Sequence, residues 1–183
     1  ERRPSGWLKH LVLAAPQSEL DNPAALAGFA FGALLPGYGG YLSYVGVAES
    51  ARKKGVGTRL FDCFSKILIA DATLLGESLP FIIWESYRPT ADDPPAMHKL
   101  WQARLKLFDR AGAYWLDGVD FLTPNWADEA GPAVPLQLFI KPVEESLSSL
   151  TPKRLAEVIE GLHQWVYHEG PGDDNYDATL ASI

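Results

Sequence analysis

Short runs of apolar residues, separated by turn residues, fill the first part of the chain and predict β-strands. The first strand is expected at Leu8–Ala14, the second at Leu26–Leu35 and the third at Tyr41–Val47. In the second run apolar side chains occupy both odd and even positions, which is typical of a strand covered on both faces. In the third run the odd positions from Tyr41 to Val47 are expected to share one face of the sheet.

Apolar residues three or four positions apart then predict two helices. The first helix follows a basic glycine loop and carries Val56, Leu60, Phe64, Ile67 and Leu68 on one face. The second helix ends at Gly112, because glycine accepts the left-handed backbone that closes many helices, and it carries Met97, Trp101, Leu105 and Phe108. Further strands are expected at Phe81–Tyr87, Tyr114–Leu122 and Val134–Ile140.

The last part of the chain predicts one more helix and a tail. Thr151 is placed to cap this helix, and Pro152 occupies its first turn, where a proline is well tolerated. The apolar face of the helix is expected to dock on the sheet, and a dimer contact or a lid over a pocket is the alternative. The polar residues from Asp173 onward are expected to form a mobile tail.

Composition narrows the classes of protein that the chain can belong to. Of its 183 residues 47% are hydrophobic and 21% are charged, which is typical of a folded domain. The formal net charge of −7 argues against nucleic acid as the main ligand and favours a cationic partner. The one cysteine, Cys63, excludes an internal disulfide and a cysteine-based zinc site, and it is expected to pack in the core.

Neither a membrane segment nor a metal site is expected. No apolar run reaches the ~20 residues that cross a bilayer, and the start at Glu1–Pro4 does not read as a signal peptide. We therefore expect a cytoplasmic protein with no membrane partner. His163 and His168 are spaced wrongly for one helix face, so no metal ligation is expected.

A basic glycine loop, Arg52-Lys53-Lys54-Gly55-Val56-Gly57, lies between a predicted strand and a predicted helix. The unpaired N–H groups and the positive dipole end at a helix start can hold phosphate, and glycine lets a phosphate approach the backbone closely. A glycine turn with a solvated basic face is the alternative. Thr58 stands where a P-loop needs lysine, and Leu60 where a dinucleotide fingerprint needs its third glycine, so both patterns are excluded.

The segment from Val47 to Gly57 resembles the acetyl-coenzyme A loop of the GNAT N-acetyltransferase superfamily, in which a strand is followed by Arg/Gln-x-x-Gly-x-Gly/Ala and a long helix. Residues 107–113, Leu-Phe-Asp-Arg-Ala-Gly-Ala, are similar to a later segment of the same family. The resemblance implies an α/β (α+β) fold with a mixed, mostly antiparallel sheet and helices on both faces. It assigns this domain to residues 1–145, with an apparently shortened N-terminal portion, and leaves 146–183 as a helical C-terminal extension.

The resemblance also implies a binding site for acetyl-coenzyme A, which would be a co-substrate. The strand residues Val45, Gly46 and Val47 would pair with pantetheine in a gap beside the strand at residues 81–87, and an N–H near Val47 would polarise the acetyl carbonyl. Phe108 would lie near the thioester. The pyrophosphate would be held by the backbone and side chains of Arg52, Lys53, Lys54, Gly55, Val56, Gly57 and Thr58.

Acetyl transfer to an amine needs a base, because a primary amine is mostly protonated near neutral pH. Glu85 is the candidate, since it lies on the strand that lines the gap, and partial burial would raise its pKa. The alternative is that Glu85 pairs with a nearby Arg or Lys, or orients the acceptor. Glu49, where many family members have proline, is the weaker candidate. Phe108 stands where many members have a proton-donating tyrosine. A thiolate can leave without a strong acid, because the ordinary pKa of a thiol is about 8.5, and Tyr87 or Tyr114 could substitute.

The sequence therefore predicts an N-acetyltransferase that acts on a primary amine of a small molecule or peptide. Transfer of another acyl group, or transfer to a hydroxyl, is an alternative within enzymes. A non-catalytic module that binds or senses acyl-coenzyme A is the alternative from another class, and a general phosphate-binding domain is a third. A homodimer is also possible.

Overall fold

A computed structural model describes residues 8–128, 131–144 and 150–183. The chain start at Glu1–Pro4 and the domain boundary expected between residues 145 and 146 lie outside the described residues. The strands are β1 (Leu8–Ala14), β2 (Gly28–Leu35), β3 (Gly39–Val47), β4 (Phe81–Ser86), β5 (Tyr114–Trp115), β6 (Phe121–Thr123) and β7 (Val134–Pro142). The helices are α1 (Val56–Leu75), α2 (Pro95–Arg110), α3 (Pro152–Leu162) and α4 (Asp174–Ala181).

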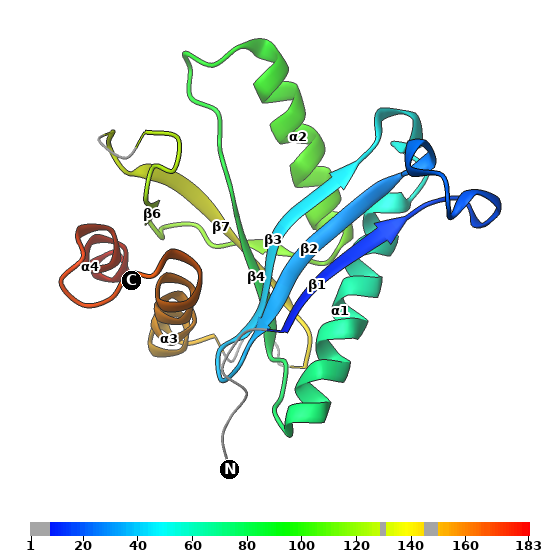
Figure 1. Ribbon diagram of the computed structural model, residues 1–183. Helices are drawn as coiled ribbons and strands as arrows, with labels where there is room; N and C mark the ends of the chain where they lie inside the picture. The colour runs from blue at the N-terminus through cyan, green and yellow to red at the C-terminus, as the bar shows by residue number, and fades with distance from the viewer. Residues whose placement is uncertain (1–7, 129–130, 145–149) are drawn as a thin grey trace.

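The strands form a mixed sheet in the order β1-β2-β3-β4-β7-β5, and β6 also pairs with β7. Only β3 and β4 are parallel among these pairs, because helix α1 carries the chain from one to the other. Helices α1 and α2 lie on one face of the sheet, and α3 and α4 lie on the other (Figure 1). The expected mixed, mostly antiparallel sheet with helices on both faces is therefore confirmed.

Two hydrophobic cores lie on the two faces of the sheet. The first lies between the sheet, α1 and α2, and the second lies between the sheet and α3. Strand β2 contributes to both, since Leu34 belongs to the first core and Leu35 to the second. The expectation that β2 is covered on both faces holds only for its second half, because Phe29 and Phe31 remain partly exposed.

A β-bulge changes the direction of the side chains in β3. The register with β2 shifts between Phe31 and Gly32, which pair with Tyr44 and Leu42, so Ser43 is an extra residue. Tyr41 therefore belongs to the second core, whereas Val45 packs against the first. The expectation that the odd positions of β3 share one face is wrong, because the extra residue inverts the alternation.

Residues 114–122 form two short strands instead of the single strand that was expected. Between β5 and β6 the chain turns at Gly118, whose φ of 87° lies in the left-handed region. Both strands pair with β7, which is long enough to hold them one after the other. Asp117-Gly118 marks this turn in the sequence, so the expectation of one continuous strand overlooked a turn signal.

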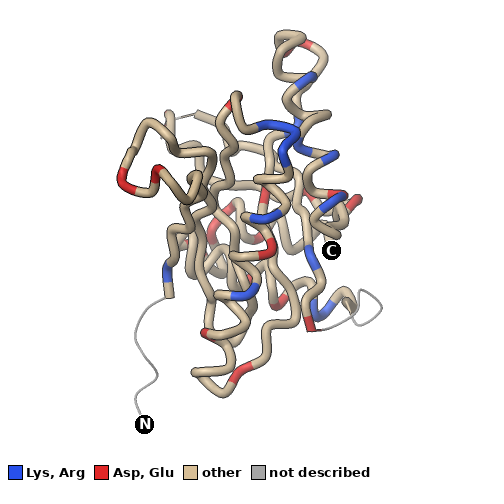
Figure 2. The backbone as a smooth tube through the Cα atoms, turned by 90° about the vertical axis from the view of Figure 1, so that its right-hand side faces the viewer, with Lys and Arg blue, Asp and Glu red and all other residues tan. Residues whose placement is uncertain are grey.

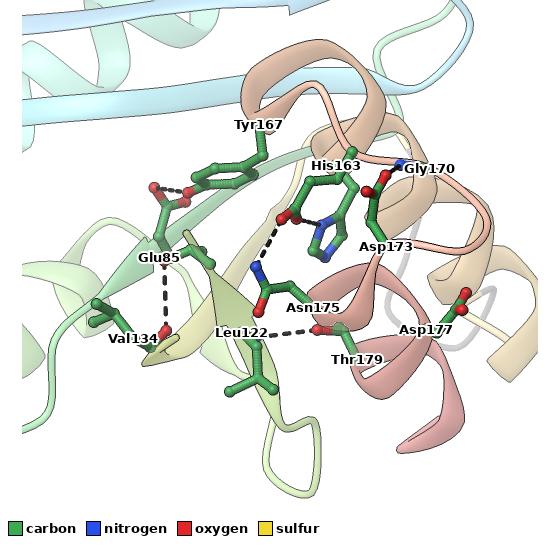
Figure 3. Close-up of polar contacts among 12 residues, drawn as sticks. Glu85, Leu122, Val134, His163, Tyr167, Gly170, Asp173, Asn175, Asp177 and Thr179 are labelled. Atoms are coloured by element: carbon green, nitrogen blue, oxygen red, sulfur yellow. Dashed lines mark hydrogen bonds and ion pairs between the residues drawn. The ribbon is translucent and has the colours of Figure 1, made fainter. Parts of the chain in front are cut away.

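The C-terminal residues are not a tail without structure, because they form helix α4. The Leu122 N–H donates to Thr179 Oγ1 at 3.0 Å (Figure 3). The Asp120 N–H donates to Ser182 Oγ at 3.0 Å. The Tyr176 hydroxyl donates to Glu160 Oε1 on α3 at 2.8 Å. These contacts hold α4 against β6 and α3, and they explain why a polar segment with little amphipathic pattern is ordered. No helix among the described residues could span a membrane.

The bulge creates a site where a side chain cannot be added. A Cβ atom on Gly32 would collide with the carbonyl oxygen of Tyr41 and would lie 2.6 Å from Phe64 Cζ. We expect Gly32→Ala to lower the free energy of unfolding by about 1–3 kcal/mol, because a backbone oxygen cannot move aside as a flexible side chain can. Gly170→Ala is the control, since a Cβ there has no neighbour within 4 Å. Equal stability of the two variants in denaturant unfolding would contradict this expectation.

Candidate functional site

A gap opens between β3 and β4. The two parallel strands pair only at Gly40 with Ile82 and at Tyr41 with Ile83, and beyond these pairs they diverge (Figure 1). The Ala48 N–H donates to Ala27 O at 2.9 Å, on the side of β2. Backbone groups alternate between the two edges of a strand, so those of Val45 and Val47 face the gap. Those of Gly46 face β2.

The basic glycine loop lies at the end of β3, beside this gap. Lys53 and Gly55 have φ values of 64° and 76°, both in the left-handed region. Left-handed residues of this kind turn successive backbone N–H groups toward one side, as in anion-binding nests. Gly55 precedes α1 and has no side chain to cap it, so the N–H groups of the first helical turn have no capping side chain at this position and can donate hydrogen bonds to a ligand. These are the groups of Val56, Gly57 and Thr58.

Helix α2 brings further positive charge to the same side. Gly57 is buried, and a Cβ there would lie 2.7 Å from Leu107 Cδ1, so the first turn of α1 rests directly on α2. Lys and Arg positions gather on the side of the molecule that Figure 2 turns toward the viewer. Half of the chain's 16 Lys and Arg residues lie in the loop, the first turns of α1, and α2, namely Arg52, Lys53, Lys54, Arg59, Lys99, Arg104, Lys106 and Arg110. This region is therefore basic although the chain is acidic overall.

An aromatic cluster packs under α1 and α2, next to the point where β3 and β4 separate. Phe108 is buried, and its ring centroid lies 5.2 Å from that of Trp84 and 4.7 Å from that of Phe139. Trp84 also contacts Phe61 at 5.2 Å. Trp84 is the first residue of β4 beyond its pairing with β3. Phe108 is thus close to the gap, and the ring offers no proton to a reacting group.

A carboxylate lies on the opposite side of β4. Glu85 Oε1 accepts hydrogen bonds from the hydroxyls of Tyr41 at 2.7 Å and Tyr167 at 2.9 Å, and Figure 3 shows Glu85 and Tyr167 pointing toward one another. The other oxygen, Oε2, is buried and has no hydrogen-bond partner among the described residues. Burial raises the pKa of Glu85, and the two tyrosine hydrogen bonds oppose that rise. Burial likewise raises the pKa of both tyrosines, so they remain hydrogen-bond donors.

No Arg or Lys forms an ion pair with Glu85 within the part of the chain that the structure describes. One of the two alternatives considered for Glu85, a structural ion pair, therefore finds no support. The two tyrosines were not foreseen. Tyr41 reaches Glu85 only because the bulge separates it from Val45, and Tyr167 arrives from a π-helical turn at His163–Tyr167 that follows α3. No local motif marks either position.

Other candidate residues lie apart from this arrangement. The Tyr87 hydroxyl donates to Asp93 at 2.8 Å in the loop after β4, and Tyr114 is exposed on β5. Glu49 is exposed in a short 3-10 turn before the glycine loop. Cys63 is exposed on α1, which corrects the expectation of a core position. Its helix has enough larger apolar residues to fill the core without it.

The two histidines also differ from one another. His163 is fully buried, and its Nδ1 lies 2.9 Å from Glu169 Oε2, a contact that joins the end of α3 to the segment before α4. His168 closes the π-helical turn with a φ of 60°. No group of three or more His, Cys, Asp and Glu residues could hold a metal ion in the described ranges.

Comparison of the fold with solved structures finds GNAT acetyltransferases. A protein from Bacteroides thetaiotaomicron that is assigned to the GNAT family is 16% identical, with a TM-score of 0.53 over 88% of this chain and 74% of that chain. A Bacillus subtilis acetyltransferase in complex with coenzyme A is 17% identical, covering 74% and 77%, with a TM-score of 0.45. An aminoglycoside 6′-N-acetyltransferase complexed with coenzyme A is 18% identical, covering 73% and 72%, with a TM-score of 0.47.

The chain therefore has the GNAT acetyltransferase fold, and the first of these structures carries that conclusion. No protein-family model matches the chain. No curated protein matches it in sequence. The resemblance that the glycine loop and the residue 107–113 segment indicated is confirmed at the level of the fold.

Burial of Glu85 should make the protein less stable as pH rises. A carboxyl whose pKa is raised on folding contributes full stability below its ordinary value of 4.5, and this contribution is lost as pH rises through the folded-state pKa. A pKa that is higher by one in the folded state than in the unfolded state corresponds to ~1.4 kcal/mol. We expect Glu85→Gln to raise the thermal unfolding midpoint relative to the wild type, by an amount that grows as pH rises above 4.5 toward the folded-state pKa.

The same replacement at Glu157, which lies on the surface of α3 in a contact with Arg154, controls for removal of a surface charge. A Glu85→Gln variant that is less stable than the wild type at every pH would show instead that the carboxylate has a purely structural role.

Proposed function

We propose that the protein transfers an acetyl group from acetyl-coenzyme A to a primary amine of a small molecule or peptide. The observation that carries the proposal is the gap between β3 and β4, with the glycine loop at one end and Glu85 beside it. The confirmed fold supports an acyltransferase of the GNAT type. This chemistry requires three features. They are N–H groups at the start of α1 that can bind phosphate, Lys and Arg residues around the loop, and a buried carboxylate.

The described residues fit the co-substrate. The loop from Arg52 to Thr58 would hold its phosphates through backbone N–H groups and the exposed side chains of Lys53 and Lys54. Val45 and Val47 have backbone groups directed at the gap, and they would pair with the pantetheine amides as an added strand does. When bound, acetyl-coenzyme A supplies an acetyl group activated as a thioester.

Glu85 would act as the base. Glu85 takes a proton from the protonated amine, directly or through water, which frees the lone pair of the nitrogen. The nitrogen then forms a bond to the acetyl carbon as the carbon–sulfur bond breaks, the sulfur keeps the bonding electron pair, and the second excess proton on the nitrogen passes to solvent. A backbone N–H at Val47 would polarise the acetyl carbonyl. A raised pKa suits Glu85 to this task, because a base is most effective when its pKa approaches the working pH. Tyr41 and Tyr167 would position the carboxylate.

We propose an amine as the acceptor because a negative charge lies on the face of β4 that carries Glu85. Glu85 is a carboxylate without a cationic partner among the described residues, and the net charge of the chain is −7. Both features attract a protonated amine electrostatically as it approaches the protein. Phe108, which offers no proton, leaves a module that only binds acyl-coenzyme A as the second candidate.

A calorimetric titration with acetyl-coenzyme A, with AMP as the control ligand, tests the proposal. Saturable binding of acetyl-coenzyme A but not of AMP, followed by release of free thiol with a panel of amines, would support the enzyme. Binding without thiol release would support the binding module. Equal binding of both ligands would indicate a general phosphate site, and absence of binding would contradict the proposal.

Charge reversal in the loop should weaken binding of the co-substrate. We expect Lys53→Glu/Lys54→Glu to raise the Kd for coenzyme A at least about tenfold, since a hydrogen bond to a charged group contributes ~1.5–3 kcal/mol. Lys66→Glu/Lys153→Glu is the matched control, because it reverses the same number of charges at two exposed lysines outside the loop. An equal loss of affinity in both variants would point to net charge alone and not to the loop.

The tyrosine contact should tune the pH dependence of the reaction. Tyr167→Phe removes a hydrogen bond that favours the ionised form of Glu85, so its pKa rises further. We expect the acid limb of the kcat/KM profile to move up by about one pH unit or more. Tyr176→Phe is the control, because Tyr176 is also buried and donates to a different carboxylate, Glu160. An unmoved acid limb in Tyr167→Phe would remove Glu85 from the role of base.

A further inference from the structure

The indole N–H of Trp84 is a buried donor without a hydrogen-bond acceptor in the part of the chain that the structure describes. The side chain of Trp84 is 2% exposed, and its Nε1 has no hydrogen-bond partner among the described residues. The rings packed against it are those of Phe61, Phe108 and Phe139, at centroid distances of 5.2, 5.2 and 6.0 Å. All three are carbon rings, which offer at most a weak N–H···π contact.

An unpaired donor in this position is costly. Leaving a buried N–H unsatisfied is destabilising, and a phenylalanine at the same position would fill most of the space without that cost. Buried polar groups without a partner are uncommon in folded proteins, and each calls for a specific cause such as a ligand. Trp84 therefore carries a group that packing alone does not require.

The position of Trp84 indicates what that ligand is. Its backbone lies one residue beyond Ile83, the last residue of β4 that pairs with β3, so it stands where the gap begins. Its ring touches Phe108, the residue that takes the place of a hydroxyl donor next to the thioester in the resemblance described above. The site thus lacks a hydroxyl at Phe108 and has a spare N–H donor on the ring beside it.

We propose that Trp84 donates a hydrogen bond from Nε1 to the sulfur of coenzyme A in the gap. This inference rests on the proposed function. As the carbon–sulfur bond breaks, the electron pair stays on the sulfur, and the indole N–H stabilises the growing negative charge without giving up its proton. The Trp84 N–H then stabilises the leaving thiolate by its partial positive charge, whereas the Phe108 ring has no proton to donate to it.

Heteronuclear NMR of the full chain tests this directly, because each of the six tryptophans gives one indole N–H signal. The Trp84 signal is assigned by its loss in Trp84→Phe, and independently by its proximity to the ring protons of Phe108 should that variant fail to fold. Coenzyme A is compared with desulfo-coenzyme A, which lacks only the sulfur. The backbone signal of Gly55 reports binding of either ligand at the loop.

We expect the Trp84 indole proton to shift downfield with coenzyme A and to stay in place with desulfo-coenzyme A, while Gly55 shifts with both. Equal Trp84 shifts with the two ligands, or none with either while Gly55 responds, would overturn the inference and leave the proposed function intact. No response of Gly55 to coenzyme A would overturn both. In turnover, Trp84→Phe should lower kcat on the order of tenfold with KM little changed.

Discussion

The limited parallel pairing of β3 with β4 is the constraint on which the rest of the site depends. Two residue pairs, Gly40 with Ile82 and Tyr41 with Ile83, hold the halves of the sheet together, and the strands then separate. A fully paired ladder would use the backbone groups of Val45 and Val47 internally and would close the space between Trp84 and β3. Because α1 must cross between parallel strands, its free N-terminal turn is also brought to the open end of the gap.

Much of this arrangement could be predicted from local patterns. The strand, glycine loop and helix around Val47–Val56 are defined by residues that are neighbours in sequence, and the position of Glu85 follows from the strand that carries it. The partners of Glu85 could not be predicted in the same way. Tyr41 reaches it through a bulge that appears only when β3 is paired with β2, and Tyr167 comes from 82 residues further along the chain.

Strand β4 separates two kinds of chemistry by the simple alternation of its side chains. Trp84 points into the aromatic core under α1 and α2, and Glu85 points to the face that α3 and the following turn cover. One side of the strand is therefore apolar with a single donor, and the other presents a carboxylate held by hydroxyls. The apolar pattern of residues 81–87 identified a buried strand, but it could not show that two of its consecutive residues each have a polar atom without a partner within residues 8–128, 131–144 and 150–183.

The hydrogen bond from Tyr167 to Glu85 joins the C-terminal helices to the centre of the sheet, and this bond has a thermodynamic consequence. The hydroxyl favours the ionised carboxylate, but packing of α3 and its π-helical turn on this face also buries Glu85, and burial has the larger effect on its pKa. By linkage, ionisation of Glu85 must in turn weaken the packing that buries it. Packing of the C-terminal helices and ionisation of Glu85 are therefore thermodynamically coupled, so that a change in either one shifts the other.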